Sequence, residues 1–521
     1  MEIKLPFIRD SFWQLLTVYV LLILAIAFSY ISKFSYYFNA FALIIAIFGI
    51  SLLTKNKNIN SEFFNEKIHI ALFILAIILI IFLRVIPYQN GISIPLGYDA
   101  GLYNYIIEHG LENMDYWVRA GVEPGFLYFM TFLNSFISSN YLLTYVFIGF
   151  IVLLGISIYI FTKEYFQNKD IALLAILFYS VSLVQFKVFT FLYYKNIIAL
   201  SLLLLAFTFL NQKKYWLFTI FGILIGIIHR PTFYIFGLSY LAFALTSPYS
   251  NKKYSTKILF KHILHGSLIL LGTLVFYIGK FKPSITNLIS PVVSSFIETG
   301  TAPGTFITFL DYQFSILFYL PLAILGLFAL IQSQKEKLDY FFFYTIFLLA
   351  IVYFQFFFFN RYIIFLDIAL IILSALGSYK IIQEKNLYGV ILVAILLVSG
   401  LILAFNVSLN TKSLISQGVF DSISKINVDE NAYIISISSK YSPYLQGYAG
   451  ENLNKNYRII APGLLDYDLF ATRERWNVFW QDLDASELKS YYNEEIYLFT
   501  PNQIDNPCYT SQSLNLYKWI C

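Results

Sequence analysis

Long apolar stretches separated by short polar loops dominate residues 1–406 of the chain. A membrane-spanning helix needs about 20 mostly apolar residues, and windows of that length predict about thirteen spans. They lie near residues 12–30, 37–54, 67–86, 140–162, 170–187, 192–210, 214–229, 231–246, 260–279, 314–332, 339–358, 362–380 and 388–406. No small-residue cleavage site follows the first run, so it is expected to remain as an anchor. The pattern predicts an all-α polytopic membrane domain over 1–406.

Two of these segments differ from an ordinary span. The spans predicted on either side of His229 and Arg230 are short, which favours a broken or re-entrant pair. The stretch "EPGFLYFMTFLNSFI" at 123–137 is expected to form a helix along the outer interface, because the sidedness of the other loops requires that it does not cross.

Lysines and arginines occupy alternate loops, which predicts a cytoplasmic N-terminus by the positive-inside rule. The loops 87–139 and 280–313 then lie outside the plasma membrane. The residues that set this orientation are Lys4, Arg9, Lys55, Lys57, Lys67, Lys163, Lys169, Lys213, Lys214, Lys252, Lys253, Lys257, Lys261, Lys335, Lys337, Lys380 and Lys385.

Polar residues return abruptly after the last span, and residues 407–521 are expected to form a small extracytoplasmic α/β domain. A strand is predicted for "AYIISIS" at 432–438, and turns for "SPYLQGYAG" at 442–450 and "APGLLDYD" at 461–468. Cys508 and Cys521 both lie in this domain. They form a bridge or remain two unpaired thiols, and the sequence leaves both options open.

Composition supports the membrane class. Hydrophobic residues make up 59% and charged residues 12% of the 521 residues, and the mean hydropathy is +0.69, which excludes an ordinary soluble domain. The net charge of +5 comes from residues in loops between spans, so nucleic acid is not an expected partner. There is no Walker A sequence, Rossmann fingerprint, nucleophile elbow or metal-ligand histidine pair.

The stretch "GYDAGLYNYIIEHG" at 97–110 places an acid next to the membrane. Asp99 lies between Gly97 and Gly101 and before an aromatic segment that contains Tyr103. A carboxylate at that boundary is partly desolvated, which raises its pKa and makes it a better proton acceptor. For the other acids of this loop a solvated position is favoured, and they are Glu108, Glu112 and Asp115.

Several cations on the outer side run against the positive-inside rule. Arg230 and Arg361 lie at the outer ends of apolar segments, and Lys187 and Lys195 lie on the same side. Arginine at an interface either snorkels or holds a phosphate through two parallel hydrogen bonds, and a lipid phosphate is the expected anion. Glu123, just before Pro124, has equal standing as a helix cap and as a functional acid.

Two further features leave alternatives open. The outer loop 281–312 suits a mobile lid that offers Glu298 and Asp311, and a passive connector is an equal alternative. Asp367 is the main charged residue predicted near the middle of a span, and such charges are few, which counts against an ion pump.

Four segments together resemble the GT-C superfamily of membrane glycosyltransferases. This group includes catalytic subunits of oligosaccharyltransferase, protein O-mannosyltransferases and the aminoarabinose transferases of lipid A. The matching segments are "GYDAGLYNYIIEHG", "VEPGFLYF", "GIIHRPTFY" and "NRYIIFLDIALIILSALG". The resemblance extends over most of the chain through loose motifs.

The resemblance implies a sugar donor linked to a polyprenyl phosphate or diphosphate, and a protein, lipid or glycan acceptor. It implies catalytic roles for Asp99 and Glu123. No cofactor is certain. A requirement for a divalent cation such as Mg or Mn stays open, and the ligands of such a cation are unknown. The chain lacks a second acid two residues from Asp99 and a "WWD" motif, which disfavours transfer to sequons. The implied substrate-binding residues are Tyr103, Lys195, His229, Arg230, Arg361 and Tyr362.

Two alternatives compete with this function. A surface-polysaccharide polymerase fits the same motifs almost as well, and the C-terminal domain favours the transferase. A non-enzymatic flippase or transporter of lipid-linked glycans belongs to another class, and it predicts a polar cavity lined by charges at several depths.

Overall fold

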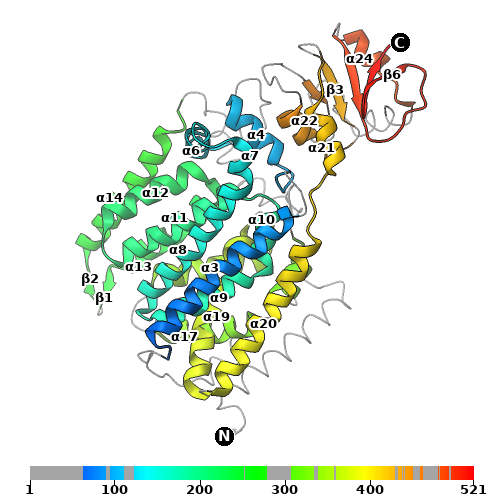
Figure 1. Ribbon diagram of the computed structural model, residues 1–521. Coiled ribbons are helices and arrows are strands. Elements are labelled where there is room, and N and C mark those ends of the chain that lie inside the picture. The colour runs from blue at the N-terminus through cyan, green and yellow to red at the C-terminus, as the bar shows by residue number, and fades with distance from the viewer. Residues whose placement is uncertain are drawn as a thin grey trace.

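The computed structural model is mostly helical, with one small sheet at its C-terminal end (Figure 1). It describes residues 63–89, 94–110, 122–250, 253–278, 307–333, 338–356, 359–385, 387–428, 432–436, 438, 440–449, 458–460, 479, 482–491 and 494–521. The helices of the first part are α3 (Glu66–Gln89), α4 (Ala100–His109), α6 (Pro124–Asn134), α7 (Ser139–Tyr141), η2 (Leu142–Val146), α8 (Phe147–Phe166), α9 (Lys169–Val181), α10 (Leu183–Thr190), α11 (Tyr194–Asn211), α12 (Tyr215–Ile228), α13 (Arg230–Thr246), α14 (Thr256–Val275), α16 (Phe309–Ile316), α17 (Leu320–Ser333), α18 (Tyr340–Tyr353), α19 (Phe359–Lys385) and α20 (Leu387–Asn410). A two-stranded hairpin, β1 (Tyr249–Ser250) and β2 (Lys253–Tyr254), joins α13 to α14.

Among the described residues, six helices are long and apolar enough to cross a membrane, and the number of spans rises to eight if each of two bent helix pairs counts as one. The predicted thirteen spans are therefore not confirmed. The segments predicted at 12–30 and 37–54 lie outside the described residues. Two other predicted spans form the shorter helices α12 and α18. The helix expected at 123–137 is α6, whose 11 residues are too few to cross a bilayer.

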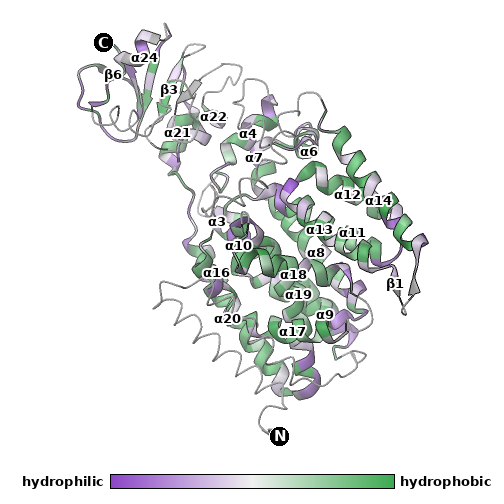
Figure 2. Ribbon diagram, turned by 180° about the vertical axis from the view of Figure 1, so that it is seen from behind, coloured by the Kyte–Doolittle hydropathy of each residue, from purple (hydrophilic) through white to green (hydrophobic). Residues whose placement is uncertain are grey.

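Helix α19 is the central element of the bundle. The membrane-length part of this helix is completely enclosed by protein, and it packs against α9, α17, α18 and α20. A helix that is apolar on all sides is expected in such a buried position. Figure 2 shows hydrophobic residues along the bundle helices and more hydrophilic residues at their ends and in the C-terminal part.

Two predicted spans are broken helices. The span predicted at 170–187 bends by 52° between α9 and α10, and the span predicted at 314–332 bends by 82° between α16 and α17. At the first break, the hydroxyl of Ser182 accepts a hydrogen bond from the amide of Gln185 and so caps α10. At the second break, Pro321 occupies the first turn of α17, where proline is tolerated.

Both breaks meet at one buried carboxylate. Asp367, in α19, is fully buried, and its Oδ2 accepts hydrogen bonds from Ser182 Oγ at 3.0 Å and Gln185 Nε2 at 2.8 Å. The hydroxyl of Tyr319, at the α16–α17 break, donates to the other oxygen. A buried charge needs such partners, so Asp367 connects the two breaks to the central helix.

The C-terminal part contains a five-stranded mixed sheet, which confirms the predicted small α/β module. Its strands are β3 (Tyr433–Ser436), β4 (Arg458–Ile460), β5 (Ile496–Phe499), β6 (Tyr509–Ser513) and β7 (Leu516–Trp519), in the order β4-β3-β5-β7-β6. Strand β3 runs parallel to β4 and β5, whereas β7 is antiparallel to β5 and β6. The helices of this part are α21 (Gln417–Ser424), α22 (Ser442–Tyr448) and α24 (Ser486–Tyr491).

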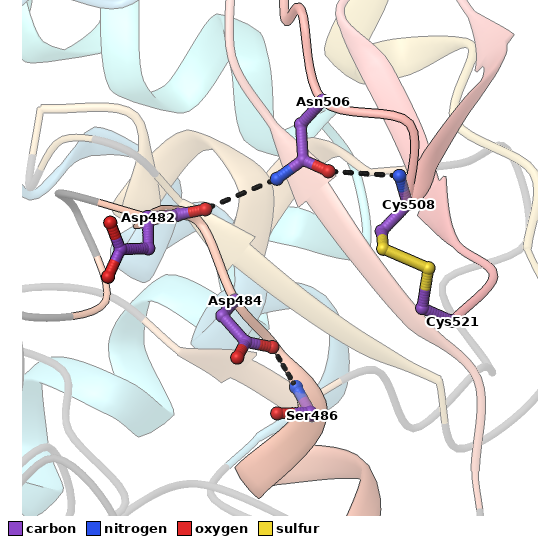
Figure 3. The surroundings of a disulfide bond; sticks show 6 residues. All are labelled: Asp482, Asp484, Ser486, Asn506, Cys508 and Cys521. Atoms are coloured by element: carbon purple, nitrogen blue, oxygen red, sulfur yellow. Dashed lines mark hydrogen bonds between the residues drawn. A yellow bond between two sulfur atoms is a disulfide. The ribbon is translucent and has the colours of Figure 1, made fainter.

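The structure decides between the two options for the cysteines and corrects the prediction of turns at 442–450. Cys508 and Cys521 form a disulfide that joins the start of β6 to the end of β7 (Figure 3). The segment "SPYLQGYAG" is not a run of turns, because it forms helix α22 with Pro443 in the first turn. Proline in that position fits a helix start, which the sequence interpretation overlooked. The segment "APGLLDYD" lies outside the described residues.

Candidate active site

The predicted site residues lie at the first turns of several helices. Asp99 precedes α4, Glu123 precedes α6, Lys195 is the second residue of α11, Arg230 begins α13, and Arg361 is in the first turn of α19. Hydrogen bonds and charge interactions connect these five residues to one another. Because a helix N-terminus carries partial positive charge, the arrangement favours an anion.

Glu123 is the centre of an ion-pair network. Its Oε2 accepts a hydrogen bond from Lys195 Nζ at 2.7 Å, and its Oε1 lies 3.3 Å from Arg230 Nε. Oε1 also lies 3.5 Å from the backbone nitrogen of Arg230, at the start of α13. Both oxygens are thus committed, although neither caps α6, the helix that Glu123 precedes.

The cations keep Glu123 ionised. Its side chain is only 2% exposed, and burial alone raises the pKa of a carboxyl group. The charges of Lys195 and Arg230 outweigh that effect and lower the pKa of Glu123 to about 2. A carboxylate with so low a pKa is a weak base, so its chemistry is that of a fixed negative charge.

The Asp99 carboxylate, unlike that of Glu123, forms no ion pair with a described residue that would occupy its oxygens. It occupies the cap position of α4, but its side chain forms no capping hydrogen bond. The residue has an exposed surface, although protein surrounds the carboxyl as densely as it surrounds a buried group. Asp99 is therefore a carboxylate that protein surrounds on most sides and that keeps an accessible surface. This enclosure raises the pKa of Asp99, and the nearby charges of Lys195 and Arg361 lower it by a smaller amount.

The turn that carries Asp99 requires glycine at position 97. Gly97 has a φ of +96°, a region that residues with a side chain rarely adopt. A Cβ atom there would lie 2.7 Å from Leu192 Cβ, which is an impossible contact. The Asp99 turn therefore packs directly on the turn that leads into α11 and Lys195.

Tyr103 lies close to both acids. Burial raises the pKa of its phenol, and the charges of Asp99 and Glu123 raise it further. The phenol therefore stays protonated and is a hydrogen-bond donor. Its ring packs on Phe126 at 5.4 Å between centroids, which fixes the first turns of α4 and α6 against each other.

His229 and Tyr362 form the deeper part of the site. The Nδ1 of His229 accepts from the amide of Thr232, so the imidazole caps α13 and its Nε2 carries the proton in the neutral form. The ring of His229 stacks on Phe365 at 6.3 Å. Tyr362 is buried and lies close to Arg361 and Tyr234.

All eight predicted site residues thus converge in three dimensions. Three described tyrosines of the same cluster were not predicted. Tyr193 is close to Asp99 and Arg361, whereas Tyr234 and Tyr277 are close to Arg230 and Glu123. Tyr234 follows Arg230 by one helical turn, and that spacing is the signal that could have identified it.

Of the other acids predicted in the outer loops, the structure describes two, and both lie apart from the cluster. Glu108 is exposed near the end of α4, and Asp311 lies in the first turn of α16. Glu112, Asp115 and Glu298 lie outside the described residues.

A divalent cation does not fit the carboxylates of this cluster. Glu123 is already paired with two cations, and Asp99 has Lys195 and Arg361 as its charged neighbours. Within the described residues, no group of three or more His, Cys, Asp or Glu side chains could hold a metal ion.

Charge and exposure define what the cluster can bind. Three cations, Lys195, Arg230 and Arg361, face two carboxylates, and Arg361 is exposed. The arrangement offers an electropositive surface for an anion next to an available carboxylate. No family model matches the chain, and no curated protein sequence matches it.

Proposed function

We propose that the protein is a membrane glycosyltransferase that moves a sugar from a polyprenyl-phosphate-linked donor to an acceptor outside the membrane. One observation carries the proposal: Asp99, with no capping bond, lies beside Lys195 and Arg361 at the ends of apolar helices. A lipid-linked sugar phosphate needs this combination, because its tail requires an apolar surface, its phosphate requires cations, and its acceptor requires a base.

The reaction is a single displacement. The acceptor hydroxyl transfers its proton to the Asp99 carboxylate while its oxygen forms a bond to the anomeric carbon of the sugar. The bond between that carbon and the phosphate oxygen breaks, and the lipid phosphate leaves with the bonding electrons. A single displacement inverts the configuration at the anomeric carbon.

The cations act on the leaving group. Arg361 is exposed and close to Asp99, so it is the group best placed to hold the donor phosphate. Lys195 is 15% exposed and Arg230 is 14% exposed, so both retain an accessible surface while they pair with Glu123. They stabilise the negative charge that develops on the phosphate as the bond breaks.

We assign Glu123 a positioning role in this reaction. A pKa of about 2 keeps it ionised under all working conditions, and its two cation contacts fix Lys195 and Arg230. It acts on the reaction through these cations, and it does not accept the acceptor proton.

The direct test is sugar transfer by the purified full-length protein in lipid vesicles. Radiolabelled sugars on polyprenyl monophosphate and on polyprenyl diphosphate are offered with a mixture of membrane and envelope acceptors. Release of lipid phosphate together with labelled product of inverted configuration is expected with one donor class. Failure of every donor to turn over, with bound donor detectable, would favour a flippase.

A surface-polysaccharide polymerase is the second candidate, since it uses the same donor phosphate and the same base. Product length separates the two functions. One added sugar unit per acceptor supports the transferase, and a ladder of repeats supports the polymerase.

A further inference from the structure

Helix α22 of the C-terminal domain contacts α4 backbone to backbone (Figure 1). A Cβ atom added to Gly101 would lie 1.7 Å from the carbonyl oxygen of Pro443. A Cβ atom added to Gly447 would lie 2.1 Å from the carbonyl oxygen of Gly101. Neither glycine can carry a side chain without separating the two helices.

Buried hydrogen bonds cross the same contact. Asn104 is 4% exposed, and its Nδ2 donates to the carbonyl oxygen of Gly447 at 2.8 Å. Tyr444 is fully buried, and its hydroxyl donates to the carbonyl oxygen of Gly97 at 3.0 Å. Such bonds have strict geometry, so they fix the register of α22 against α4.

These contacts lie on both sides of Asp99 in the sequence. The Gly97 carbonyl lies two residues before it, and the Gly101 backbone lies two residues after it. The Asp99 side chain makes no capping bond, so the backbone of this turn is what sets the position of its Cα and Cβ atoms. On the other side, this backbone rests on Leu192, in the turn that leads to Lys195.

We propose that α22 positions the Asp99 carboxylate for transfer by holding the backbone on both sides of it. This inference rests on the proposed function of Asp99. Tyr444 and Gly447 are positioning residues in this view, since they touch the chain that carries the base and reach it from more than 300 residues away in sequence.

The kinetic test compares two glycine substitutions in the same domain. Gly447→Ala introduces the 2.1 Å clash, whereas a Cβ atom at Gly418 in α21 would meet nothing within 4 Å. We expect Gly447→Ala to lower kcat by about tenfold or more, since a misplaced reacting group costs up to about 10²-fold. The donor KM should stay within about twofold, because the cations are not displaced. Gly418→Ala should behave as wild type.

A second, smaller substitution tests the same contact with less risk of misfolding. Tyr444→Phe removes only the hydroxyl, which bonds to the carbonyls of Gly97 and, at 3.4 Å, Pro95. Tyr517→Phe is its control in the sheet, where the hydroxyl makes a longer bond of 3.5 Å to Asn502. We expect a lower kcat and a shifted pH profile for Tyr444→Phe only. Wild-type kcat and pH profile in folded Gly447→Ala and Tyr444→Phe would overturn the proposal.

A second readout does not depend on activity. In an Asp99→Cys background, the rate of reaction with a soluble maleimide reports the position of residue 99, and Cys508 and Cys521 are protected by their disulfide. Gly447→Ala should change this rate severalfold, and Gly418→Ala should leave it unchanged. Equal rates would overturn the positioning role. If wild type transfers no sugar, the proposed function fails, and the labelling rates still decide whether α22 places residue 99.

Discussion

Lys195 Nζ donates a hydrogen bond of 2.7 Å to Glu123 Oε2 across 72 positions of sequence. The same carboxylate lies 3.3 Å from Arg230 Nε, so one buried acid connects the starts of α6, α11 and α13. This buried acid holds two cations beside it, and the proposed function assigns these cations to the donor phosphate.

Glu123→Gln should destabilise the protein. Removing one partner of a buried ion pair leaves uncompensated charge, at a cost of about 3 kcal/mol. Thermal unfolding in detergent at pH 7 measures this loss, with Glu108→Gln on the exposed end of α4 as the control. A Glu123→Gln variant as stable as Glu108→Gln would contradict the network.

The Glu123 contribution should depend on pH with a defined sign. Its folded pKa of about 2 lies below the ordinary value of 4.5, so the stabilisation is complete above pH 4.5 and is lost as the pH falls towards 2. The stability difference between wild type and Glu123→Gln should therefore shrink in acid. A difference that grows below pH 4.5 would show that the charge does not stabilise the fold.

Arg361→Ala should impair transfer more than any change to a cation elsewhere in the chain. Losing a charged donor to a developing negative charge costs about 10²-fold in rate, and the donor KM should rise as well. Lys163→Ala, an exposed change at the end of α8, is the control. Arg361→Lys should recover part of the loss, because lysine keeps the positive charge. The recovery should be incomplete, because lysine cannot form two parallel hydrogen bonds to a phosphate. Equal activity of Arg361→Ala and Lys163→Ala would remove Arg361 from the site.

Asp367→Ala should destabilise the bundle without changing the donor KM. The substitution leaves Ser182 and Tyr319 as buried donors that lack this acceptor, and Gln185 keeps only its longer bond of 3.3 Å to the Ile364 carbonyl, at a cost of about 3 kcal/mol in total. Asp367→Asn keeps one carbonyl acceptor and should cost less. Thermal unfolding with Asp421→Ala as an exposed control checks both expectations, and an unchanged midpoint for Asp367→Ala would rule out the structural role.

The Cys508–Cys521 disulfide should stabilise the C-terminal sheet. It closes a loop with a sequence separation of 13, and the entropy model gives about 3 kcal/mol for a loop of that size. Unfolding of the domain with and without reductant measures the effect. The double substitution to serine should reproduce the reduced state, and no difference between oxidised and reduced protein would contradict this account.

The sequence predicted which charged residues lie together better than it predicted the helices of the bundle. The positive-inside rule predicted that Asp99, Lys195, Arg230 and Arg361 lie at the same ends of their helices. In the structure these residues lie close together. That rule concerns only which end of a helix a residue occupies. The cluster lies at helix ends, so the rule was sufficient to group its residues.

Hydrophobicity windows could not detect the helix breaks. An apolar run with a bend of 52° or 82° has the same mean hydropathy as a straight one, so 170–187 and 314–332 were predicted as single spans. The bond between Tyr319 and Asp367 is equally invisible, because it joins positions far apart in sequence. Helix α22 was missed for another reason: its glycine and proline residues resemble turn signals, yet tertiary contacts with α4 favour the helix.

The measurement closest to the central claim is the turnover of Asp99→Asn beside Glu108→Gln, two neutralised acids at opposite ends of α4. Asp99→Asn should lose at least about 10²-fold in kcat, the usual contribution of a general base, with donor binding and folding intact. Glu108→Gln should retain wild-type turnover. Wild-type turnover in Asp99→Asn would contradict the account, because the available carboxylate would then not be the base.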